Sequence, residues 1–219
     1  MSVIDYATIS AELEPHGLLP RGGFHTLPSD ALDGQTVVMV GHAGPATFRA
    51  FAAAREDVAN PLDHWSRRVI GGVASRLGAV AMHPFERPLR PFQQWGSRAE
   101  PLHASPIGLM IHPEYGLWHG WRGALLFPQR LEVPPRAEAS GPCDSCAAKP
   151  CLSACPVEAF RPAGFDVDRC RSHVRGAGAD CRGFGCRARH ACPVGQAYAY
   201  VPAQAAFHMT AYSRDRPAH

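Results

Sequence analysis

The sequence GPCDSCAAKPCLSACPVEAF, from Gly141 to Phe160, decides how the chain is divided. It holds four cysteines, and a proline follows the last of them. Four more cysteines come after it, and the last of these also precedes a proline. No cysteine lies before Cys143, so a cysteine-free part is joined to a cysteine-rich part. The eight cysteines are Cys143, Cys146, Cys151, Cys155, Cys170, Cys181, Cys186 and Cys192.

The spacing of the first four cysteines is close to the C-x2-C-x2-C-x3-C-P run of bacterial ferredoxins. Here the second gap holds four residues. In that run three thiolates bind one cubane, and the fourth, next to the proline, binds the other. Eight thiols match the needs of two [4Fe-4S] clusters. We therefore assign one cluster to Cys143, Cys146, Cys151 and Cys192, and the other to Cys155, Cys170, Cys181 and Cys186.

Two structural zinc sites, free thiols or a disulfide set are the alternatives for these cysteines. Zinc ribbons usually carry paired C-x2-C knuckles, whereas this chain has a single C-x2-C at Cys143 and Cys146. The start of the chain has early acids and no basic segment followed by an apolar one, so we expect no signal peptide and a cytoplasmic protein. Thiols stay reduced in that compartment, which favours iron–sulfur clusters over disulfides.

The bulk composition excludes some classes of partner. The formal net charge is +3, and Lys149 is the only lysine. Nucleic-acid binding requires a clustered basic face, so no nucleic-acid partner is expected. No stretch approaches the roughly 18 apolar residues of a membrane span. The sequence leaves the oligomeric state open.

A proline-rich stretch divides the chain into two domains. We place the first domain at residues 1–130, a linker at 131–142 and the second domain at 143–219. The first domain mixes helix and strand patterns, which predicts an α+β fold. Two short helices are expected in the second domain, one after Cys155 and one around Cys170.

The first domain contains one helix with a clear pattern. Residues 61–77 place apolar side chains three to four positions apart, with Asn60 as the expected cap and Gly78 as the expected end. Short strands are predicted at Thr36–Val40 and Ala79–His83. Residues 107–128 predict a β-hairpin, with two strands around a turn at Pro113–Gly116.

This last segment, GLMIHPEYGLWHGWRGALLFP from Gly108 to Pro128, resembles the signature of the cobalamin-processing CblC (MMACHC) family. MHPFERP, from Met82 to Pro88, is similar to a second element of that family, with His83 at the matching histidine. The residues that match the signature are Gly108, Ile111, His112, Pro113, Tyr115, Gly116, Trp118, Arg122 and Gly123.

The order of this segment and the cysteines also resembles epoxyqueuosine reductase (QueG) and the reductive dehalogenases. Those enzymes hold a cobalamin above two [4Fe-4S] clusters. The resemblance implies a nitroreductase-like α/β sandwich followed by a small bacterial-ferredoxin-like domain. The chain also departs from its relatives: CblC lacks the cysteine-rich part, and the tRNA-binding module of epoxyqueuosine reductase is absent here. No catalytic acid can be matched, so no catalytic residue is assigned.

The resemblance implies that a corrinoid is held by Arg122, His112, Tyr115, Gly116, Trp118, Gly108 and His83. Ordinary structural roles are the alternatives. Arg122 would otherwise be a surface arginine, and His112 would bond the backbone of its turn. Trp118 and Tyr115 at this spacing are more often core residues than cofactor walls.

The sequence therefore predicts an iron–sulfur redox protein that binds cobalamin. An external donor (a flavodoxin, a ferredoxin or a reductase) would reduce two [4Fe-4S] clusters, which would pass electrons to the corrinoid. The expected activity is reductive cobalamin processing, as decyanation or dealkylation, by a cobalamin-dependent or cobalamin-reducing oxidoreductase. Flavin is not expected as a cofactor. An electron carrier or cobalamin chaperone is one alternative, and a cobalamin-dependent reductase of an organic substrate is another.

Overall fold

The computed structural model describes residues 4–176 and 180–214, and the chain divides into two compact units. The sheet unit contains Met1–Leu102 and His119–Ala139. The cysteine unit contains His103–Trp118 and Ser140–His219. Helices and strands are mixed along the chain, which confirms the predicted α+β class.

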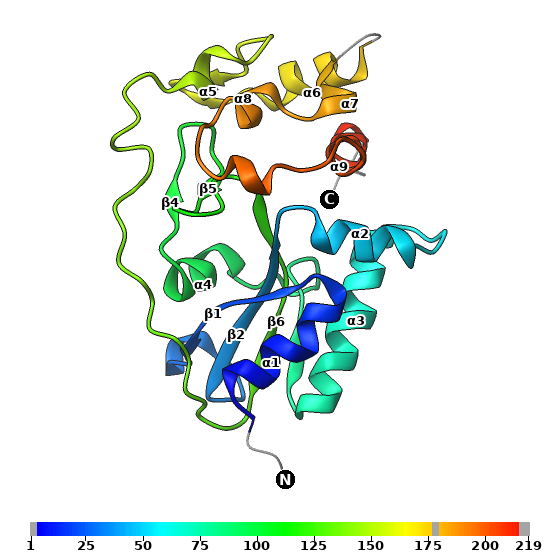
Figure 1. Ribbon diagram of the computed structural model, residues 1–219, viewed down its shortest axis with the longest axis vertical. Helices are drawn as coiled ribbons and strands as arrows, with labels where there is room; N and C mark the ends of the chain where they lie inside the picture. Colours follow the sequence, from blue (N-terminus) through cyan, green and yellow to red (C-terminus); the bar gives the residue numbers. More distant parts are fainter. Residues whose placement is uncertain (1–3, 177–179, 215–219) are drawn as a thin grey trace. The chain divides into compact units, whose positions relative to one another are not determined.

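A four-stranded antiparallel sheet forms the centre of the sheet unit (Figure 1). Its order is β1 (Leu19–His25), β2 (Thr36–Ala43), β6 (His119–Phe127) and β3 (Val80–Met82). Strand β2 is buried along almost its whole length because it lies between two partners and is covered on both faces. The predicted strands at Thr36–Val40 and Ala79–His83 are both present, as β2 and β3.

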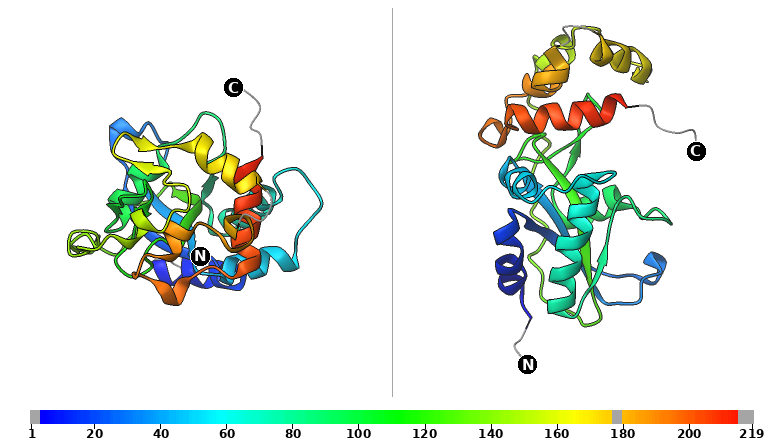
Figure 2. Two further views of the ribbon diagram at one scale, coloured as in Figure 1. Left: turned by 90° about the horizontal axis from the view of Figure 1, so that it is seen from above. Right: turned by 90° about the vertical axis from the view of Figure 1, so that its right-hand side faces the viewer.

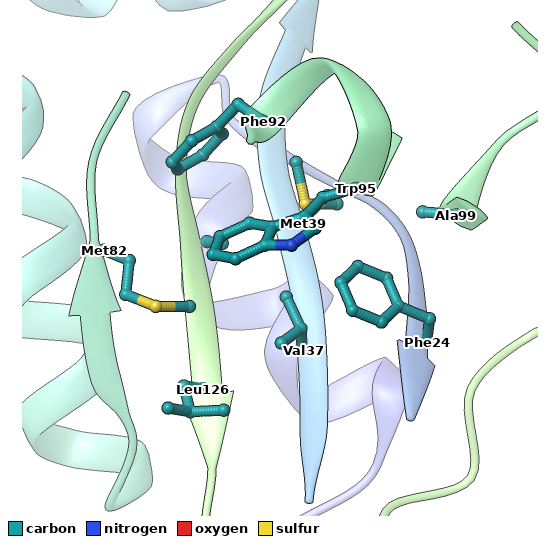
Figure 3. Close-up of a cluster of buried hydrophobic side chains, with 9 residues drawn as sticks. Phe24, Val37, Met39, Met82, Phe92, Trp95, Ala99 and Leu126 are labelled. Carbon is teal, nitrogen blue, oxygen red and sulfur yellow. The ribbon is translucent and has the colours of Figure 1, made fainter. Parts of the chain in front are cut away.

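Helices cover both faces of this sheet. Helix α4 (Phe92–Ala99) lies in front of β2 and β6 in Figure 3, and α1 (Tyr6–Leu13) lies behind them. Helix α3 (Pro61–Leu77) also packs on β6, where Ile70 meets Gly123. Helix α2 (Ala46–Ala53) packs beside β2. The core under α4 consists of Phe24, Val37, Met39, Met82, Phe92, Trp95, Ala99, Ala124 and Leu126.

Helix α3 has the predicted bounds and the predicted buried face. Gly78 ends it in the left-handed conformation, at φ +64°. Asn60 is the N-cap residue, but its side chain makes no capping hydrogen bond and its own φ is +49°. The expected side-chain cap is therefore wrong, although the first helical position is Pro61 as predicted.

Two other predictions about local structure are wrong. Residues 107–128 do not form a hairpin, because β5 (Met110–Ile111) pairs with β4 (His103–Ala104), whereas β6 pairs with β2 and β3. A single bridge joins His112 and Gly116. The helix expected after Cys155 is a turn that leads into β7 (Phe160–Arg161).

Short elements make up the cysteine unit. Strand β7 pairs with β8 (Gly164–Phe165). The helix predicted around Cys170 is present as α6 (Val167–Arg175). Helix α9 (Pro202–Ser213) packs against α6 and α7 (Figure 2). The other helices are α5 (Pro150–Ser153), α7 (Asp180–Phe184) and α8 (Arg187–His190), and the short 3-10 turns of the chain are Glu14–His16, Pro28–Asp30 and Gln196–Tyr198.

The compact units differ from the predicted linear division in one segment. His103–Trp118 belongs with the cysteine unit although it lies within the predicted first domain. Residues 131–141 form neither helix nor strand, as a linker would. Their first part nevertheless packs on the sheet unit, since Leu131 is buried and Arg136 donates to the carbonyl of Ser97. Among residues 4–176 and 180–214, no helix has the length and apolar character needed to cross a bilayer.

Candidate metal centre

Four thiols of the cysteine unit line one small cavity. These are Cys143 and Cys146, which lie in a loop, Cys151 in α5, and Cys192 just after α8. The cavity has a volume of about 20 Å³. Cys151 and Cys192 are buried, and they pack against Ile107, Ile111 and Leu117.

These four thiols lie close enough together to affect one another's pKa. Burial is the largest factor that raises the pKa of Cys143, and the thiols of Cys192 and Cys151 raise that pKa further. Burial likewise raises the pKa of Cys151, and Cys192 and Cys146 add to it. The contributions of the neighbouring cysteines share one origin, because a thiolate nearby disfavours the ionisation of a second thiol. The four thiols therefore form one electrostatically connected group.

The other four thiols line a second, larger cavity of about 380 Å³. Cys170 lies in α6 and Cys181 in α7, while Cys186 is the N-cap residue of α8. Cys155 follows α5, and the backbone N–H of Ala159 donates to its sulfur at 3.3 Å. The cavity brings together thiols that lie up to 31 positions apart, from Cys155 to Cys186.

These thiols also influence one another. Burial is the largest factor that raises the pKa of Cys170, and the thiols of Cys155 and Cys181 contribute. Burial raises the pKa of Cys186 as well, followed by smaller contributions from Cys181 and Cys170. A hydrogen bond from Tyr212 acts in the opposite direction and lowers the pKa of Cys170.

The donors of each cavity fit a [4Fe-4S] cluster, which is held by four cysteine thiolates. The structure groups the thiols into the same two sets of four that were assigned from the sequence. All eight are free thiols rather than disulfides. Within the part of the chain that the structure describes, no three His, Cys, Asp or Glu side chains come close enough to share a single metal ion. That the two sets hold clusters stays a prediction.

The predicted corrinoid residues are divided between the two units. Gly108, His112, Tyr115, Gly116 and Trp118 lie in the cysteine unit, whereas His83 and Arg122 lie in the sheet unit. Gly108 lines the second cavity, with φ +75°.

His112, Tyr115 and Gly116 form a tight turn. Nδ1 of His112 accepts from the backbone N–H groups of Glu114 and Tyr115, at 3.1 and 3.2 Å. Its ring also stacks on Tyr115. Gly116 has φ +58°, and a Cβ there would lie 2.0 Å from the carbonyl oxygen of Val194. These contacts agree with the structural alternative for His112.

Trp118 is buried among aromatic and cationic side chains. It is 1% exposed, and its indole nitrogen has no hydrogen-bond partner among the described residues. Edge contacts join its ring to His190 and Tyr200. The guanidinium of Arg189 lies over both Trp118 and Tyr200, with its carbon 4.8 and 4.3 Å from the ring centres.

Arg122 lies on the α3 side of the sheet. The pairing of β6 with β2 shifts register between Val40 and Gly41, which leaves Arg122 as an extra residue in β6. Its guanidinium donates to Asp63 and Ser66 of α3, at 2.5 and 2.9 Å. Arg122 is therefore engaged in a structural ion pair.

His83 lies next to Arg122. It is 2% exposed, and its Nδ1 lies 3.0 Å from the carbonyl oxygen of Arg122. The neutral ring would therefore carry its proton on Nδ1. Its Nε2 has no partner among the described residues. Burial lowers the pKa of this histidine, which favours the neutral form.

Sequence reasoning missed several polar side chains around these sites. Tyr212 and Arg189 both line the second cavity. Arg21 is 1% exposed and forms a two-fold ion pair with Glu100 in the sheet unit. No spacing rule singles out these residues, because their partners lie far away in the sequence.

Comparisons with known proteins give a fold and no closer assignment. A scan against models of protein families finds no match, and neither does a search of curated proteins. The C. elegans protein CblC, a B12-trafficking protein and a homologue of human MMACHC, has a similar structure. The TM-score is 0.55 at 15% identity, and the match covers 93% of this chain and 91% of that chain.

Epoxyqueuosine reductase from Streptococcus thermophilus is also similar, with a TM-score of 0.52 at 15% identity. The match covers 87% of this chain and 66% of that enzyme, so the chain spans just under two thirds of the reductase. An epoxyqueuosine reductase solved with a modified tRNA-Tyr stem loop gives a TM-score of 0.51 at 15% identity, over 88% of this chain and 66% of that one. The structure thus confirms the layout suspected from the sequence: the chain shares its fold with CblC and with epoxyqueuosine reductase.

Proposed function

We propose that the chain is an iron–sulfur redox protein that binds a cobalamin and passes electrons to it from two [4Fe-4S] clusters. One observation carries this proposal: two cavities of the cysteine unit are each lined by four thiols. Four cysteine ligands for each of two sites match the requirement of a two-cluster ferredoxin.

The chain's part in this function is to hold and surround the clusters. When bound, the clusters supply one-electron transfer. Buried apolar side chains, among them Ile107 and Leu117, pack against the thiols and keep water away from them. Donors such as the N–H of Ala159 face the sulfurs and stabilise their negative charge.

The corrinoid part of the proposal rests on the resemblance to CblC and on the shared fold. Buried polar atoms without a partner in the described ranges are compatible with ligand binding. Nε2 of His83 and the indole nitrogen of Trp118 are two such atoms. Each atom is considered within its own unit: Nε2 of His83 can accept a hydrogen bond from an amide group, and the indole nitrogen of Trp118 can donate one.

The proposed reaction is reductive processing of the corrinoid, by decyanation or dealkylation. The reducing equivalents come from an external one-electron donor such as a flavodoxin, a ferredoxin or a reductase. The protein contributes binding, orientation and electrostatics, while the cofactor supplies the chemistry. A cytoplasmic location and the absence of a nucleic-acid partner belong to the same proposal.

The test is to purify the full chain without oxygen and to measure its iron and sulfide. We expect about eight iron atoms per chain, as two cubanes require. Titration with cobalamin should then shift the corrin absorbance to the form without its lower axial base. Zinc in place of iron would overturn the redox proposal. Iron without any change in the corrin spectrum would overturn its corrinoid part.

A second candidate function is an electron carrier or cobalamin chaperone without catalysis of its own. The ion pair of Arg122 with Asp63 favours it, because this arginine already has a structural partner. Turnover with a chemical reductant distinguishes the candidates. A carrier would bind iron, and a chaperone would also bind the corrinoid, but neither would remove the upper ligand. The shared fold with epoxyqueuosine reductase keeps reduction of an organic substrate as a third candidate.

A further inference from the structure

The two thiol sets differ in the residues that lie directly beside them in the chain. We call Cys143, Cys146, Cys151 and Cys192 the first set, and Cys155, Cys170, Cys181 and Cys186 the second set. The residues directly beside the first-set thiols are proline, alanine, leucine, serine and Asp144, with no arginine or lysine among them. One acid, Asp180, and four arginines lie directly beside the second-set thiols. The four are Arg169, Arg171, Arg182 and Arg187.

The net charge of the chain is concentrated in the same region. In the sheet unit twelve basic residues are balanced by twelve acidic ones, whereas the cysteine unit has ten basic and seven acidic residues. Residues 159–190, which contain three of the second-set thiols, hold seven arginines and three aspartates. A local excess of one sign attracts partners of the opposite sign, over a range of about 10 Å at 0.1 M salt.

Two of the arginines beside the second set are exposed and form no ion pair with a described residue. These are Arg169 of α6 and Arg182 of α7. Arg169 donates to the carbonyl of Val157, which is a neutral group. Asp180, by contrast, pairs with Arg187, so these two charges offset each other.

Exposed apolar side chains accompany these two arginines. Phe184 at the end of α7 is 65% exposed, the highest value among the large hydrophobic residues that the structure describes, and Val167 at the start of α6 is 39% exposed. Helices α6 and α7 pack against each other (Figure 1). We call Val167, Arg169, Arg182 and Phe184 the α6–α7 surface. Arginine and aromatic residues are enriched in protein–protein interfaces, which favours a protein as the partner of this surface.

The α6–α7 surface lies beside two thiols of the second set. Cys170 follows Arg169 in α6, and Cys181 precedes Arg182 in α7; both thiols line the second cavity. Consecutive Cα atoms are about 3.8 Å apart. A partner that contacts these arginines is therefore separated from the second set by about one residue of backbone. Electron-transfer encounters are small, below about 1,200 Å² of buried surface, so a surface of this size is sufficient.

We propose that an acidic one-electron carrier protein docks on the α6–α7 surface and reduces the chain at the second set. The inference rests on the proposed function, because it requires a cluster at that set. In the transfer the flavin or iron–sulfur group of the carrier loses one electron and the cluster gains one, with no bond made or broken. A nucleic acid would also be attracted by the arginines, but it would not explain why they lie beside one thiol set.

The experiment follows reduction of the full chain, purified without oxygen, by a reduced acidic flavodoxin. Visible absorbance records the rate, and electron paramagnetic resonance identifies the reduced clusters. The double variant Arg169→Gln/Arg182→Gln removes two positive charges from the surface. We expect its second-order rate constant to fall about three- to tenfold at low salt. The difference should vanish near 1 M salt, where the screening length is about 3 Å.

A matched double variant controls for the change in net charge. Arg49→Gln/Arg130→Gln removes two exposed arginines of the sheet unit and should leave the rate constant unchanged. Phe184→Ala should slow the reaction at low and at high salt, because salt does not screen an apolar contact. Reduced methyl viologen is a small cation that needs no docking surface, so it should reduce every variant as fast as the unchanged chain.

Three outcomes would overturn the inference. The first is a flavodoxin reaction that the α6–α7 variant does not slow, and the second is an equal loss in the matched double variant. The third is tighter binding of a tRNA than of flavodoxin at 0.15 M salt, if the α6–α7 variant abolishes it, because a nucleic acid would then be the partner. A chain that lacks iron and accepts no electron from viologen overturns the proposed function instead, so iron analysis separates the two failures.

Discussion

Arg21 shows how a single charged residue is accommodated in the sheet unit. It lies in β1 at 1% exposure, where two of its nitrogens donate to Glu100 at 2.5 and 2.7 Å. A third nitrogen donates to the carbonyl of His42 at 2.8 Å. Both charges are buried, so each depends on the other for compensation.

We expect Arg21→Met to lower the free energy of unfolding by about 3–5 kcal/mol, because it leaves the Glu100 carboxylate buried and unpaired. Denaturant unfolding of the full chain measures this loss. Arg76→Met is the matched control: Arg76 pairs with Glu12 at the surface, with exposed fractions of 53% and 34%. An exposed pair contributes only about 0–1 kcal/mol. Similar losses in both variants would contradict the prediction.

Two glycines of the cysteine unit allow the energetic cost of backbone strain to be distinguished from the cost of a steric clash. Gly116 and Gly108 both have positive φ, at +58° and +75°. An added Cβ would lie 2.0 Å from the Val194 oxygen at Gly116 but would meet no atom within 4 Å at Gly108. Alanine at either position strains the backbone by roughly 1–2 kcal/mol.

Gly116→Ala should therefore lower the melting temperature of the iron-loaded chain more than Gly108→Ala does. Thermal unfolding of the two variants, followed by the visible absorbance of the iron, makes this comparison. Equal shifts would mean that the turn at Gly116 moves easily away from Val194.

At the scale of elements, α4 is held to the sheet by a few large side chains. Trp95 is 2% exposed and packs between Phe92 and Phe24, whose ring centres lie 5.3 and 6.2 Å away (Figure 3). Trp95→Ala removes this buried ring, and we expect a loss of about 3–5 kcal/mol in unfolding free energy. Gln94→Ala on the exposed face of the same helix should cost less than about 0.5 kcal/mol. A small loss for Trp95→Ala would mean that α4 is not part of the stable core.

The elements differ in how far the sequence predicts them. Helix α3 was predicted to the residue because its apolar positions repeat over 17 residues. Helix α4 has 8 residues and a glycine in the middle, so its pattern is too short to be recognised. Gly96 is required there, since an added Cβ would lie 2.0 Å from the ring of Trp121. That requirement comes from β6, far along the chain.

The predicted hairpin failed for a related reason. Both of its strands were recognised as apolar segments around a turn, and β5 and β6 do lie on either side of it. Their hydrogen-bond partners, however, are β4 for the first strand and β2 and β3 for the second. Local periodicity indicates that a segment is extended, but the choice of partner depends on residues elsewhere.

At the scale of the whole molecule, the cysteines were the most informative part of the sequence. Their grouping followed from spacing and from the rule that the thiol before proline joins the other cluster. The surrounding residues could not be found in this way. Tyr212 lies 42 positions after Cys170, and only the packing of α9 against α6 brings them together. The grouping of the thiols around two cavities could therefore be predicted from the sequence, whereas their electrostatic surroundings could not.

The two sets can be tested separately through the iron content. Cys151→Ser removes a thiol of the first set, and Cys170→Ser removes one of the second. We expect each variant to retain about four iron atoms of the eight, because each lacks a ligand for only one cubane. Iron and sulfide analysis measures this, and the remaining resonance signal should differ between the two variants. Identical remaining signals would show that the thiols are not divided in this way.

Loss of the metal should destabilise the cysteine unit far more than the sheet unit, because the stability of the two units depends on the metal to different degrees. Among the described residues of the cysteine unit, apolar side chains form small clusters, and thiols are part of one of them, where Ile111 and Leu117 pack against Cys151 and Cys192. Such a unit gains much of its stability from the bound metal. The sheet unit has a separate core and no cysteine.

Chelation of the iron should therefore increase hydrogen exchange throughout the cysteine unit and leave the sheet unit protected. The decisive peptides lie on either side of the boundary at Trp118. Residues 103–118 should lose protection together with residues 140–176, although they precede the cysteines in the sequence. Strand β6, which begins at the next residue, should stay protected by its pairing with β2 and β3. If residues 103–118 instead stay protected with the sheet, then the predicted linear domain boundary describes the folding units better than the compact units do.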